Sequence, residues 1–150
     1  MAVNSCEIRV GRLLQIRVAK GYETPHDVDA MVDMIRASVS KLPPETKHVT
    51  VADWRQCSVM SAQASERALK MLLTVNPRTE RSGMIYANTS PTAVMQFIRL
   101  VREAGHPGRR IFHDVSELTA WLDEVLTPAE SSELHQFLGT ESVSVRRWAR

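Results

Sequence analysis

Cysteine, long apolar runs and an excess of one sign of charge are all missing or scarce in this chain of 150 residues. The two cysteines, Cys6 and Cys57, form no CxxC pair and have no histidine nearby at metal-ligand spacing, so no zinc site is predicted. The sequence leaves a Cys6–Cys57 disulfide open, although a cytosolic chain would keep both thiols reduced. No apolar run approaches the roughly 18 residues that a membrane-spanning helix needs. The net charge of +2 is too small to indicate nucleic-acid binding.

The motifs that commonly mark catalysis or cofactor binding are missing as well. The chain has no GxGxxG, no Walker loop, no HExxH, no GxSxG and no HxE followed by PCxxC. We therefore expect a protein that is not an enzyme and that uses no cofactor and no metal. The first residues, MAVNSCEIRV, lack the charged segment and apolar run of a signal peptide, which favours a cytoplasmic location.

The composition that remains is typical of a globular domain, with 43% hydrophobic and 24% charged residues. The length fits one domain that buries roughly 70% of the surface of its unfolded chain. One segment is rich in arginine, namely Arg99, Arg102, Arg109 and Arg110. We interpret these arginines as a solvated face; contact with an acidic partner or a membrane surface is the alternative.

Hydrophobic periodicity divides the chain into alternating strands and helices. Strands are predicted near residues 6–10, 13–19, 48–53, 83–88 and 109–113. Helices are predicted to begin at Thr24-Pro25, near Ser61, at Ser90-Pro91, after Asp114 and at Thr127-Pro128. This order predicts an α/β fold with a single mixed, mostly parallel five-stranded sheet, in which the first strand is antiparallel at an edge.

The domain is expected to span residues 5–138, followed by a C-terminal tail over 139–150 that lacks helical periodicity. Trp121 lies on the apolar stripe of a predicted helix and is expected to be buried. Trp148 lies between arginines in the tail and is expected to be exposed, or buried only against another subunit. The helix that begins at Pro91 is expected to turn four side chains inward: Val94, Phe97, Ile98 and Val101.

The candidate binding surface lies at the carboxyl ends of the parallel strands, where open α/β sheets bind their ligands. The residues that we assign to partner binding follow the third strand: Asp53, Trp54, Arg55, Ser58, Met60 and Ser61. We expect Trp54, Val59 and Met60 to face solvent and, together with the C-terminal tail, to form an apolar patch, which favours a homodimer. Ser61 is expected to cap the next helix, because its hydroxyl accepts an N–H of the first turn.

Two stretches carry a resemblance to a known family. VTVADWR and the closing RRIFHDVSELTAWL resemble the SpoIIAA-like branch of the STAS family, the bacterial anti-sigma-factor antagonists, which are related in fold to CRAL-TRIO lipid-binding domains. The resemblance implies a STAS-like domain over 5–138 and a regulatory role in bacterial signalling. STAS switches have an Asp-Ser-Ser-Gly quartet, and the resemblance makes Ser61 the candidate phosphorylation residue. Here Met60, Ala62 and Gln63 replace the other three members, so we predict a cap and not a switch.

Two functions remain open from the sequence. The first is a protein-interaction module, whose protein partner the sequence does not name, with a filled core and an exposed apolar patch in the 54–60 loop. The second is a carrier of a lipid or another apolar ligand, of CRAL-TRIO-like type, which needs a core pocket of roughly 300 Å³ or more.

Overall fold

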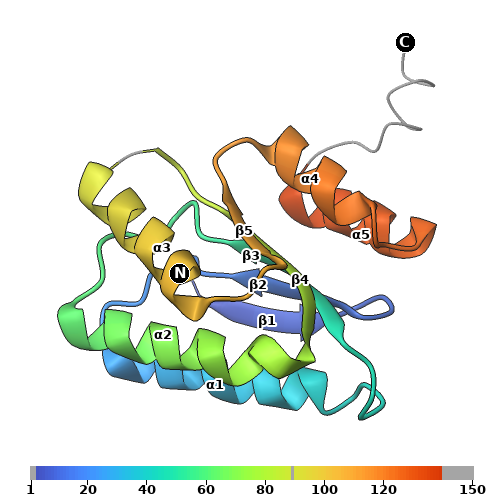
Figure 1. The fold of residues 1–150 in the computed structure, drawn as a ribbon, viewed down its shortest axis with the longest axis horizontal. Helices are drawn as coiled ribbons and strands as arrows, with labels where there is room; N and C mark the ends of the chain where they lie inside the picture. Colours follow the sequence, from blue (N-terminus) through green and yellow to red (C-terminus); the bar gives the residue numbers. More distant parts are fainter. Residues whose placement is uncertain (1–2, 89, 140–150) are drawn as a thin grey trace.

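The computed structural model describes residues 3–88 and 90–139, which form one five-stranded sheet with helices on both faces (Figure 1). The strands are β1 (Ser5–Ile8), β2 (Leu13–Arg17), β3 (His48–Asp53), β4 (Thr79–Ile85) and β5 (Arg109–Phe112). The helices are α1 (Pro25–Val39), α2 (Ala62–Val75), α3 (Pro91–Ala104), α4 (Val115–Asp123) and α5 (Pro128–Leu138), and a 3₁₀ turn, η1 (Asn76–Arg78), follows α2. The predicted fold class and order of elements are confirmed.

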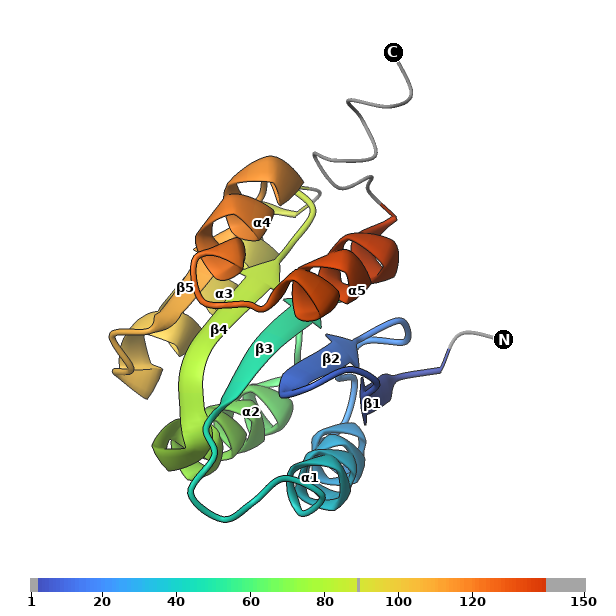
Figure 2. The ribbon, with the colours of Figure 1, turned by 90° about the vertical axis from the view of Figure 1, so that its right-hand side faces the viewer.

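The strands lie side by side in the order in which they occur in the chain, β1-β2-β3-β4-β5. The β1–β2 pair is antiparallel and the other three pairs are parallel, as predicted. With right-handed crossovers, steps in one direction across a sheet place every connecting helix on the same face. Figures 1 and 2 show this arrangement: α1, α2 and α3 cover one face, and α4 and α5 cover the other.

Capping residues that can be recognised in the sequence determine where the helices begin. Each helix begins after a residue whose side-chain oxygen accepts a backbone N–H of the first turn: Thr24, Ser61, Ser90, Asp114 and Thr127. Proline occupies the first helical position in α1, α3 and α5, where its missing N–H costs nothing.

Two hydrophobic cores lie on the two faces of the sheet. The larger core packs α1, α2 and α3 against it, and the smaller core packs α4 and α5. β3 is buried at all six positions, since it lies at the centre of the sheet and is covered on both faces. Trp121 is 7% exposed in the smaller core, which confirms that prediction; Trp148 lies outside the described residues.

Strand ends and the inward face of one helix differ from the predictions. β1 and β2 each end two residues before the predicted 6–10 and 13–19, and β5 ends one residue before 109–113. β4 spans Thr79–Ile85, not 83–88, because its polar beginning pairs in parallel with β3 from His48 onward. α3 buries Ala93, Phe97, Leu100 and Ala104, so its inward face is a narrow stripe that contains two alanines. Ile98, predicted to point inward, is 40% exposed and Met95 is 69% exposed.

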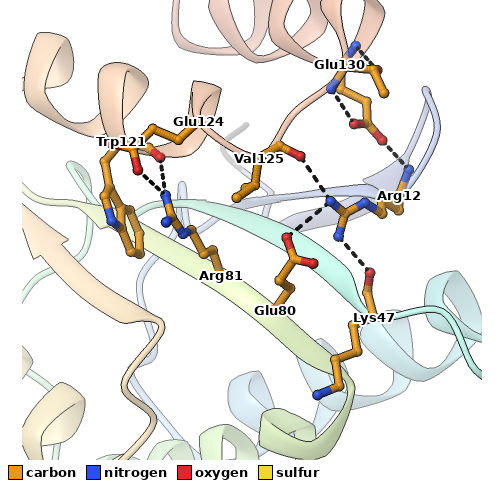
Figure 3. A network of polar contacts seen from close by, with 9 residues as sticks. Arg12, Lys47, Glu80, Arg81, Trp121, Glu124, Val125 and Glu130 are labelled. Carbon is orange, nitrogen blue, oxygen red and sulfur yellow. Dashed lines mark hydrogen bonds and ion pairs between the residues drawn. The ribbon is translucent and has the colours of Figure 1, made fainter.

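A polar network closes α5 onto the sheet at the amino end of its parallel strands (Figure 3). The buried Glu130 carboxylate accepts the Arg12 N–H at 2.8 Å and the Thr127 N–H at 2.9 Å. The Arg12 guanidinium donates to the carbonyls of Lys47 and Val125 and pairs with Glu80 at 3.1 Å. The network therefore joins the β1–β2 turn to β4, to the α4–α5 connection and to α5.

Two glycines make this packing sterically feasible. Gly11 has a φ of 56°, and a Cβ at that position would collide with the Glu130 carboxylate. At Gly83 in β4 a Cβ would collide with Leu118, so the missing side chain lets α4 lie close to the sheet.

No helix within residues 3–88 and 90–139 is long and apolar enough to cross a membrane.

We predict that Glu130→Ala lowers the free energy of unfolding by about 2 kcal/mol, because it leaves the Arg12 and Thr127 amides without their acceptor. Urea denaturation measures this change. Glu66→Ala, at an exposed position of α2, is the control and should change stability by less than about 0.5 kcal/mol. Equal losses in the two variants would show that the Glu130 contacts do not hold α5.

Candidate functional site

The carboxyl ends of β2 and β3 place an acidic side chain between two arginines. Arg17 and Asp53 are register partners at the ends of their strands. The Asp53 carboxylate accepts hydrogen bonds from Arg55 Nε at 2.9 Å and Nη2 at 3.0 Å, from the Arg55 amide at 3.1 Å, and from Arg17 Nε at 3.3 Å. The Arg17 guanidinium also lies 4.2 Å from the centre of the Phe137 ring, which connects this cluster to α5.

These contacts decide the protonation state of Asp53. Burial by itself would raise the pKa of this carboxyl, but the hydrogen bonds and positive charge of Arg55, together with the bond from Arg17, outweigh burial and lower the pKa below 3.8. Asp53 is therefore ionised at neutral pH, and both of its oxygens are engaged by arginines. Asp53 therefore anchors the start of the loop that follows and is not a free proton acceptor.

Every third side chain of the loop over residues 54–60 is buried in the larger core. Trp54, Cys57 and Met60 are all buried, with exposed fractions of 2%, 6% and 3%. The expectation that Trp54 and Met60 face solvent was therefore wrong; of the predicted patch, only Val59, at 45%, is exposed. The physical reason is that the loop bends back over the larger core, so its large apolar side chains fill that core.

Specific contacts hold the loop in this conformation. The Trp54 ring packs edge-on against Tyr22 and Phe97, with centroid distances of 5.7 and 5.1 Å. The Gln96 amide on α3 accepts from the Met60 N–H at 2.9 Å and donates to the Met60 carbonyl at 2.8 Å. The loop is thus fastened both to the core and to α3.

What the loop presents to solvent is a short polar rim. Gln56, Ser58 and Val59 are exposed, and Ser61 follows as the N-cap of α2, accepting the Ala64 N–H at 3.1 Å. The predicted cap is confirmed. Beyond the cap, a groove of about 390 Å³ runs between α2 and α3, lined by residues that include Ala62, Glu66 and Arg99.

Neither cysteine is a candidate nucleophile. Cys6 and Cys57 are both free thiols, so the disulfide that the sequence left open does not form. Burial raises the pKa of each thiol to about 11, and both are therefore protonated at neutral pH. Within residues 3–88 and 90–139 no three side chains of the metal-binding types cluster at a position that would hold a metal ion.

A second polar location, which the sequence analysis missed, lies inside the larger core at the opposite end of β3. His48 and Arg109 are both buried there. A mostly apolar cavity of about 30 Å³ between the sheet and helices α1 and α2 is lined by these two residues and, at the carboxyl end of β3, by Tyr22 and Trp54. Arg109 is 7% exposed, so its interpretation as part of a solvated face was wrong, whereas Arg99, Arg102 and Arg110 are exposed. The alternation of side chains in RRIF was the available signal, since two successive strand residues point to opposite faces.

The comparisons with known proteins support the fold. No family model matches the chain, and neither does any curated protein. Among solved structures, the chain resembles an uncharacterized protein of the DUF3478 family from Shewanella loihica PV-4, described as having a SpoIIAA-like fold. The two are 17% identical, the TM-score is 0.60, and the match covers 81% of this chain and 95% of the other. This chain has a SpoIIAA-like, STAS-like α/β fold.

We predict that Ser61→Ala lowers the free energy of unfolding by about 1 kcal/mol, since the Ala64 amide loses its cap. Ser61→Asp should retain the wild-type stability, because a carboxylate caps well and suits the positive end of the helix. Chemical denaturation of the two variants measures this change. The control is Ser58→Ala, because Ser58 is a nearby serine that is not the N-cap of α2. A loss in Ser58→Ala as large as that in Ser61→Ala would argue against the cap.

We predict that the stabilisation from Asp53 is lost in acid. A lowered pKa means that the ionised carboxylate stabilises the fold above pH 3.8, and that this contribution disappears as the pH falls through the folded-state pKa. Asp53→Asn should therefore cost about 2 kcal/mol at pH 7 and much less near pH 2. The control is Asp29→Asn, which breaks an exposed pair with Arg67 and should change stability little at either pH. A pH-independent cost at Asp53 would contradict the prediction.

Proposed function

We propose that this protein is a non-enzymatic, cytoplasmic regulatory module of a bacterial signalling system that binds a protein partner. It resembles an anti-sigma-factor antagonist without an intact phosphorylation motif. The module comprises residues 5–138, and 139–150 form its C-terminal tail. The binding face consists of the exposed residues of the 54–60 loop, the Ser61 cap, and the adjoining groove between α2 and α3.

The observation that carries this proposal is the anchoring of the loop. Three buried side chains, the paired Asp53 and the two hydrogen bonds between Gln96 and the Met60 backbone fix the backbone of residues 53–60. A loop held in this way loses little conformational freedom when a partner binds, so more of the contact energy appears as affinity. Gln56, Ser58 and Val59 are then the partner-facing members. Arg55 is half-buried against Asp53, and Trp54 and Met60 support the loop from the core.

The groove between α2 and α3 extends this face. Its charged residues include Glu66, Arg99 and Glu103, and the last two form an ion pair at 2.8 Å. A polar groove of this kind suits the solvent-accessible rim of a protein–protein interface, which is polar.

Ser61 belongs to this face as a cap. Its hydroxyl is exposed at the positive end of α2, where a phosphate would be tolerated electrostatically. Met60, one of the three replacements in the STAS quartet, is buried, so it is not available to a kinase. We therefore retain Ser61 as a binding residue and not as a regulated one.

The carrier alternative is less well supported. A lipid carrier needs a pocket of roughly 300 Å³ or more, and the core cavity measures about 30 Å³. The homodimer stays a prediction, although two of the three residues that suggested it lie in the core.

We predict that a photo-crosslinking amino acid placed at Val59 in the native host yields a discrete heteromeric adduct, identified by mass spectrometry. The same amino acid at Leu73 is the matched control, because Leu73 is an apolar residue of similar exposure, 47% against 45%, near the other end of α2. An adduct at Val59 alone supports the proposed face. The same adducts at both positions, or none at Val59, would contradict it.

A further inference from the structure

The sheet has an open edge at β1. Among residues 3–88 and 90–139, β1 pairs with β2 and has no strand on its other side (Figure 2). Alternate residues of an edge strand direct their N–H and C=O groups away from the sheet, where another extended segment can pair with them. β1 contains no proline, and its register with β2 is regular. Its outer edge is therefore able to accept one more strand.

Beside this edge, one flank of α1 offers an apolar surface. Ala30 and Met34 lie one helical turn apart and line a surface depression of about 720 Å³, together with Val3, which is 68% exposed. Asp29 pairs with Arg67 on α2, so the flank that carries Ala30 and Met34 faces away from α2, along β1.

The charged groups at this depression satisfy each other. Lys20 Nζ lies 3.4 Å from the Asp27 carboxylate, and both residues line the depression. Neither charge is left to attract an ionic ligand. The remaining surface therefore suits apolar side chains.

The two faces of β1 set the side-chain pattern that an added strand must have. Cys6 and Ile8 are half-buried and pack against the larger core, on the side of α1. Ser5 and Glu7 are exposed on the opposite face. Since successive side chains of a strand point to opposite faces, a fitting strand has apolar residues at every second position and polar residues between them.

The sequence just beyond the described chain has this alternation. Residues 142–146 read SVSVR. In an extended strand Val143 and Val145 point to one face, and Ser142, Ser144 and Arg146 point to the other. The two valines match the flank of α1, and the two serines match the polar face of β1.

The described chain also ends close to this edge. The Phe137 carbonyl accepts a hydrogen bond from Arg17 Nη2, and Arg17 is the register partner of Ser5, the first residue of β1. At roughly 3.3 Å per residue, residues 140–150 reach up to about 36 Å, whereas the four residues of β1 span about 13 Å. A segment that enters at the amino end of β1 runs parallel to it.

We propose that residues 142–146 of the same chain add a sixth strand to the sheet, parallel to β1, with Val143 and Val145 against Ala30 and Met34. The added strand pairs with the outward groups of β1 and shields an edge at which another chain could pair. A tethered tail has a high effective concentration at this edge, which favours it over the tail of a second copy. The edge and the flank contain no residue of the proposed binding face, so the two proposals fail independently.

The first test is amide hydrogen exchange of the full chain, measured residue by residue by NMR. Every second amide of residues 142–146 should exchange at least about tenfold more slowly than in a synthetic peptide of residues 140–150. Val145→Asp should abolish this protection, because it places a carboxylate against the apolar flank of α1. Ser144→Asp, at the adjacent position on the polar face of the strand, is the matched control and should retain the protection.

The second test locates the tail. A photo-crosslinking amino acid at Ala30 of the purified full chain should give an adduct with residues 142–146 inside the monomer, mapped by mass spectrometry. The same amino acid at Arg36, which is exposed on the α2 side of α1 and lines a depression with Thr74, is the control and should not give this adduct.

Four outcomes would each overturn the proposal. They are exchange as fast as in the peptide throughout residues 142–146, equal losses of protection in the two aspartate variants, equal crosslinks from positions 30 and 36, and an adduct that joins two chains. The last outcome would assign the edge to a second copy of the protein.

Discussion

The direction of the strand crossovers is the constraint on which the rest of this structure depends. Because strand order follows chain order, α1, α2 and α3 lie on one face of the sheet, and no crossover helix is left to cover the other. β3 and β4 would then expose apolar side chains such as Val49, Val51 and Ile85. The segment after β5 covers this face with α4 and α5, and Glu130 fastens it by accepting the Arg12 amide.

The same constraint separates the two polar locations of the molecule. β3 is covered on both faces, so its interior offers no solvent-facing side chains. Polar chemistry is confined to its two ends: His48 at the start, beside Arg109, and Asp53 at the finish, between Arg17 and Arg55. At the carboxyl end Asp53 is bound by two arginines, whereas at the start the described residues offer the Arg109 guanidinium only neutral acceptors, Ser82 and Asn76. The first arrangement holds a rigid loop, and the second keeps a buried positive charge among neutral hydrogen-bond acceptors.

The fold was predictable from the sequence because its signals are local. The helix caps and their prolines, together with strand alternation, determine where elements begin, and each acts within four or five residues. Features that depend on packing across the sheet were not predictable in this way. The polar start of β4 becomes a strand only by pairing with β3, and the inward face of α3 depends on Ala93 and Ala104, which carry little hydrophobic signal. The side chains of Trp54 and Met60 point into the core because the loop turns back over α3, and a linear pattern does not record that turn.

The sequential strand order also bears on how the chain reaches this structure during synthesis. Each strand from β2 onward pairs with the strand that was synthesised before it. The sheet can therefore add one strand at a time as the chain leaves the ribosome. The bond between Arg12 and Glu130 spans 118 residues and forms only when α5 has emerged. Until then the face of the sheet that α4 and α5 cover exposes apolar side chains to solvent. A nascent chain of this protein is therefore most prone to aggregation in the interval between completion of β4 and arrival of α5, a period in which a chaperone has the most to protect.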